Sequence, residues 1–64
     1  MSMSTRNELN TITSTLTELA ARITHLVESE GDTMANDVYT ELVAAERTVG
    51  ALLRRLSRVA SRST

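Results

Sequence analysis

The 64-residue chain contains no cysteine, proline, lysine, phenylalanine or tryptophan, and it has a single histidine and a single tyrosine. The absence of cysteine excludes disulfide bonds, and with only one histidine it also argues against a structural zinc site. A chain this short builds only a small hydrophobic core. We therefore expect association with another chain to supply part of the stability, and we expect no metal ion or other cofactor.

Long apolar runs are missing too. No segment approaches the roughly 20 apolar residues that span a bilayer, and the sequence lacks the charged and apolar regions of a signal peptide. A basic amphipathic helix near the C-terminus would suit an anionic membrane, but it lacks the interfacial aromatic residues that usually accompany this use. We expect a cytoplasmic protein that does not bind membranes.

Apolar residues recur in alternating steps of three and four residues on both sides of Gly31 and Asp32. The first series is Leu9, Ile12, Leu16, Leu19, Ile23 and Leu26, and the second is Val38, Leu42, Ala45, Val49, Leu52, Leu56 and Val59. This spacing predicts two heptad-patterned helices. The two series also pair by reflection about the intervening residues, as antiparallel helices joined by a short turn require. The sequence therefore predicts an all-α helical hairpin that forms one domain, residues 1–64.

Helix boundaries follow from local signals. Thr5, three residues before a glutamate, matches a capping box; Gly31 suits a left-handed residue that ends a helix; and Asp32 or Thr33 can cap the next helix. We expect a first helix over about 5–29, a turn over about 30–33 and a second helix over about 34–61.

The heptad edges predict how the hairpin assembles. We assign position a to Leu9, Leu16, Ile23, Leu42, Val49 and Leu56. Position g then predicts two ion pairs within the hairpin, Glu8 with Arg55 and Arg22 with Glu41. Position e is largely apolar, so the apolar stripe is wider than a two-helix hairpin can bury. We expect a homodimeric four-helix bundle whose interface contains Ala20, Val27, Tyr39, Leu53 and Ala60; docking of the same face on a different protein stays open.

Charge is distributed unevenly along the chain. Residues 1–46 carry two arginines and eight acidic residues, whereas residues 47–64 carry five arginines and no acidic residue. In a dimer, hairpins with their turns at opposite ends would bring unlike charges together. Four arginines form a predicted solvent-facing stripe that is a candidate contact for a partner or for nucleic acid: Arg47, Arg54, Arg58 and Arg62.

Catalysis needs an acid, base or nucleophile held in a cleft, and a small bundle of aliphatic side chains offers little room for one. We therefore expect no enzyme and no catalytic residues. The sequence favours a small protein-interaction module or regulator that dimerises and presents helix faces. The alternative is a nucleic-acid-binding regulator that uses the arginine stripe, although the net charge of −1 and the lack of stacking aromatics give it a modest electrostatic footprint.

Overall fold

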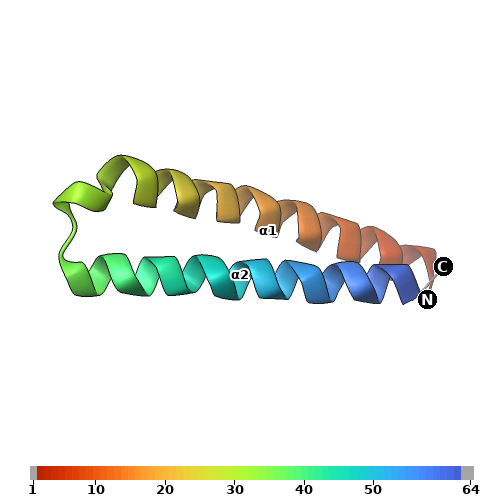
Figure 1. Cartoon of the computed structure of the whole chain (residues 1–64). Helices are drawn as coiled ribbons and strands as arrows, with labels where there is room; N and C mark the ends of the chain where they lie inside the picture. The colour runs from red at the N-terminus through yellow and green to blue at the C-terminus, as the bar shows by residue number, and fades with distance from the viewer. Residues whose placement is uncertain (1, 63–64) are drawn as a thin grey trace.

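A computed structural model describes residues 2–62 as two long helices joined by a short connection. Helix α1 spans Met3–Glu30, the 3-10 turn η1 spans Gly31–Thr33, and helix α2 spans Asn36–Arg62. The helices run antiparallel, so the start of α1 and the end of α2 lie together at one end (Figure 1). The predicted all-α helical hairpin is confirmed. Residues 1 and 63–64 of the predicted domain lie outside the described residues.

Helix α1 begins earlier than predicted because Ser2 caps it. Ser2 is extended, and its Oγ accepts a hydrogen bond from the backbone N–H of Thr5 at 3.1 Å. The N–H of Arg6 donates to the Ser2 carbonyl at 3.0 Å. Serine is a favoured N-cap because its oxygen satisfies an otherwise unpaired N–H of the first turn. The predicted capping box at Thr5 is therefore wrong.

The connection contains no left-handed residue. Gly31 has φ −56° and ψ −37°, in the right-handed helical region, and its N–H donates to the Val27 carbonyl. A Cβ atom at this glycine would lie only 3.1 Å from Cε2 of Tyr39. A side chain at this position would press on the ring of Tyr39, so glycine suits the close approach, and the predicted left-handed conformation is wrong. The chain changes direction instead at Glu30 (φ −118°, ψ 1°) and at the extended Met34 (φ −80°, ψ 147°).

Helix α2 starts two residues later than expected. The hydroxyl of Thr33 donates to the Glu30 carbonyl at 2.9 Å, which ties it to the end of α1. The first helical bond of α2 runs from the N–H of Tyr39 to the Ala35 carbonyl at 3.0 Å. Ala35 thus occupies the position that was predicted for Asp32 or Thr33 as a helix cap.

The two helices face one another through positions a and e rather than a and d. No side chain of residues 2–62 is fully buried, and the half-buried residues form one stripe on each helix. Those at positions a and e are Arg6, Leu9, Thr13, Leu16, Ala20, Ile23 and Val27 on α1, and Leu42, Glu46, Val49, Leu53, Leu56 and Ala60 on α2. Successive residues of an α-helix lie about 100° apart around its axis. The direction midway between positions a and e therefore lies about 50° from the direction midway between positions a and d. Neither described helix carries an apolar stretch long enough to cross a membrane.

Candidate interaction surface

Apart from Met3 and Tyr39, the large exposed apolar side chains of residues 2–62 lie at position d. These six side chains retain 39–48% of their accessible surface: Ile12, Leu19, Leu26, Val38, Leu52 and Val59. We call these six residues the d stripe. Ala45, which also occupies position d, is half-buried. An apolar row of this length on the surface of a small protein is typical of a surface that another chain covers.

Both halves of the d stripe lie on the same side of the hairpin. Antiparallel helices are related by a twofold axis, so equivalent heptad positions of the two helices fall on one side of the seam. At about 100° per residue, position d lies about 80° from the centre of the a and e seam. The d stripe is therefore a continuous surface along a molecule whose Cα atoms extend over 46 × 15 × 11 Å.

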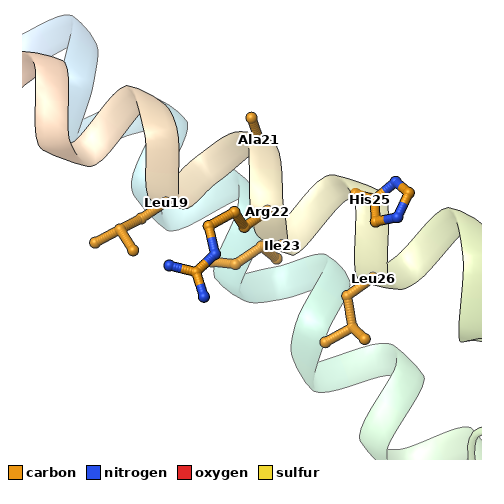
Figure 2. A pocket seen from close by; sticks show the side chains of 6 residues that line it. All are labelled: Leu19, Ala21, Arg22, Ile23, His25 and Leu26. Atoms are coloured by element: carbon orange, nitrogen blue, oxygen red, sulfur yellow. The ribbon is translucent and has the colours of Figure 1, made fainter.

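An open groove of about 690 Å³ lies on α1 within this region. Its lining comes from one stretch of α1: Leu19, Ala21, Arg22, Ile23, His25 and Leu26. Figure 2 shows that Leu19, Arg22 and Leu26 project to one side of the helix, whereas Ala21 and His25 project to the other. The two leucines belong to the d stripe, so the groove adjoins that stripe.

The residues predicted for the dimer interface are placed differently from one another. Ala20, Val27, Leu53 and Ala60 are half-buried along the seam of the hairpin. Tyr39 is exposed over 42% of its surface, and its ring lies against Gly31. The exposed apolar edge is thus position d, and position e serves contacts within the hairpin.

The size of the e residues was the signal for this arrangement. Thr13, Ala20 and Ala60 are small, so they allow the two helices to approach closely, whereas leucine and isoleucine at position d would hold them apart. A hydrogen bond adds to the seam: the Thr24 hydroxyl donates to Oε2 of Glu46 at 2.8 Å, and both residues are half-buried.

The predicted ion pairs within the hairpin are wrong. All four residues concerned, Glu8, Arg22, Glu41 and Arg55, are exposed. Among residues 2–62, neither predicted pair forms an ion pair. The reason is the rotation of the seam, which places position g about 140° from its centre. These charged residues lie next to the d stripe, on the side of each helix that is farther from the seam.

The arginines of the predicted stripe are all exposed on α2: Arg47, Arg54, Arg58 and Arg62. Between residues 42 and 62, Glu46 is the one acidic residue, and it is half-buried and bonded to α1. Every exposed charged side chain of that segment is consequently an arginine. This part of α2 has a basic outer surface.

Within residues 2–62, no three histidine, cysteine, aspartate or glutamate side chains gather as they would around a metal ion. The chain matches no protein-family model, no curated protein and no solved structure. The d stripe and the basic surface of α2 are therefore the candidate functional features of the described residues.

Proposed function

We propose that the protein is a small, non-enzymatic interaction module or regulator that acts as a homodimeric four-helix bundle, with the d stripe as its dimer surface. One observation carries the proposal: six large apolar side chains keep 39–48% of their surface exposed in a hairpin that has no fully buried side chain within residues 2–62. In a four-helix bundle each helix packs against two neighbours, and here the a and e seam serves only one of them.

The free energy gained by covering the d stripe also favours dimerisation. Full burial of a valine, leucine or isoleucine side chain contributes about 1.5–3 kcal/mol, so covering the exposed part of six such side chains contributes roughly 4–8 kcal/mol per subunit. A hairpin of this size with no fully buried side chain has little stability of its own. Folding and dimerisation are therefore coupled in this proposal.

Light scattering coupled to gel filtration tests the dimer. We expect a mass near twice the chain mass of 7.0 kDa. Leu19→Glu should weaken the dimer strongly because it places a charge within the d stripe, whereas Ala21→Glu, on the opposite side of α1, should leave it intact. A wild-type monomer that melts cooperatively at high micromolar concentration would contradict the proposal, and a stable monomer would favour a different protein as the occupant of the stripe.

A second candidate function is nucleic-acid binding, and the basic outer surface of α2 favours it. The exposed arginines are not interrupted by exposed acidic residues between positions 42 and 62. Guanidinium groups bind phosphate in a bidentate manner, and such binding weakens as salt rises. Retention of the wild-type protein on immobilised DNA or RNA at low salt tests this function; no retention would exclude it.

A further inference from the structure

The charges that border the d stripe on α2 are arranged symmetrically. Position g of α2 holds Glu41, Thr48 and Arg55, all exposed. Among residues 2–62, neither Glu41 nor Arg55 forms an ion pair. Thr48 lies midway, seven residues from each charged residue. A helix with this pattern is complementary to a second, antiparallel copy of itself.

We propose that two copies dock through their d stripes with their connections at opposite ends and with α2 against α2, so that Glu41 pairs with the partner's Arg55. This arrangement rests on the proposed homodimer and specifies its geometry. A twofold axis near the level of Thr48 brings Glu41 of each subunit beside the partner's Arg55. Two pairs of opposite charge, each between Glu41 and the partner's Arg55, then lie on either side of the uncharged Thr48.

The size of the surface fits a second hairpin. The Cα extents of 46 and 15 Å bound a face of about 700 Å², close to the roughly 800 Å² per partner of a stable interface. A hairpin of the same length covers the d stripe from Ile12 to Val59, on both helices at once. A single docked helix would cover only part of it.

The ends of the hairpin favour the same arrangement. The exposed acids Glu28, Glu30, Asp32 and Asp37 lie around the connection, and Arg58 and Arg62 lie near the opposite end. With the connections at opposite ends, each acidic end lies near the basic end of the partner. With both connections at the same end, two acidic clusters would meet, and charges within the Debye length of about 8 Å repel one another at physiological salt.

The same-end arrangement makes a different set of charge pairs. With antiparallel neighbours it places α1 against the partner's α2, so that Arg55 faces the partner's Glu8 and Glu41 faces the partner's Arg22. Reversing Glu41 and Arg55 together restores unlike pairs in the opposite-end dimer. The same double reversal creates like-charged pairs in the same-end dimer.

The test is the dimer dissociation constant from sedimentation equilibrium at low salt, with helicity checked by circular dichroism. Glu41→Arg and Arg55→Glu should each raise the Kd by about tenfold, because each creates two like-charged contacts per dimer. The double variant should return to within about threefold of the wild type. Glu18→Arg with Arg47→Glu is the matched control, because both residues are exposed and lie outside positions d and g, and it should leave the Kd unchanged.

A double variant weaker than either single variant overturns the opposite-end arrangement in favour of the same-end one, and unchanged Kd values place these charges outside the interface. A wild-type monomer at all concentrations refutes the homodimer itself.

Cross-linking provides a second measurement, since the chain has no cysteine of its own. A short bismaleimide should link two Thr48→Cys chains, but not two Thr40→Cys chains. Linkage that forms only between a Thr15→Cys chain and a Thr48→Cys chain would overturn the proposal, because it would place α1 against the partner's α2.

Discussion

The hydroxyl of Thr24 donates a 2.8 Å hydrogen bond to the carboxylate of Glu46, across the seam between α1 and α2. This contact holds the one acidic side chain of residues 42–62 against α1. The outer surface of α2 consequently carries arginine charges alone over that segment. One polar contact thus contributes both to helix pairing and to the charge pattern of the surface.

Thr24→Val should lower the free energy of unfolding by about 1 kcal/mol, because it leaves a half-buried carboxylate without its donor while keeping the β-branched shape. Urea denaturation followed by circular dichroism measures the change. Thr40→Val, at an exposed position of α2, is the control and should change stability by less than about 0.5 kcal/mol. Equal losses in the two variants would contradict the role of the hydrogen bond.

Gly50→Ala should stabilise the protein by about 0.5–1 kcal/mol. A Cβ atom there would lie 3.6 Å from Nη1 of Arg54, which is ordinary van der Waals contact, so the helix propensity of alanine is gained without a clash.

The same change at Gly31 should give less stabilisation or a loss, because the added Cβ would lie 3.1 Å from the Tyr39 ring. Thermal melts of both variants at one protein concentration provide the comparison. A larger gain at Gly31 than at Gly50 would contradict the close packing of Tyr39.

Leu16→Glu should abolish the helical signal, because Leu16 lies half-buried near the middle of the seam, where a charge costs several kcal/mol. His25→Ala, at an exposed position, should shift stability by less than about 0.5 kcal/mol. A loss at His25 comparable to that at Leu16 would show that the seam is assigned to the wrong face.

The wild-type melting temperature should rise with protein concentration if folding is coupled to dimerisation.

Changing Arg54 and Arg58 together to Gln should leave the melting temperature nearly unchanged, since both side chains are exposed. If the basic surface of α2 binds phosphate, the double variant should bind DNA or RNA more weakly. The slope of log K against log salt should fall by about two phosphate contacts per subunit. Unaltered binding in the double variant would place the phosphate contacts elsewhere on the protein.

The hairpin could be predicted from the sequence because its apolar residues keep a helical period on both sides of a short polar segment. The face through which the helices pair could not. Positions d and e are both apolar and lie on either side of position a, so the pattern alone permits packing on either edge. The small residues Thr13, Ala20 and Ala60 favour packing through position e, since small side chains allow a closer approach of two helices.

Local signals were misleading where two residues competed for one role. Ser2 and Thr5 are both suitable caps, and the structure uses Ser2, whose Oγ receives the Thr5 N–H. Gly31 resembles a left-handed helix terminator, but a glycine also permits close approach by a ring. The approach of Tyr39 is a tertiary contact, and a sequence pattern does not reveal it.

The hairpin brings the start of α1 and the end of α2 to the same end of a rod whose Cα atoms extend over 46 Å. In a dimer whose connections lie at opposite ends, the two pairs of helix ends would lie at opposite poles of the bundle. Domains fused to either terminus of the two subunits would therefore be held apart by a stiff spacer, and the length of the two helices would set the spacing. Such a dimer would hold two attached domains at a fixed separation.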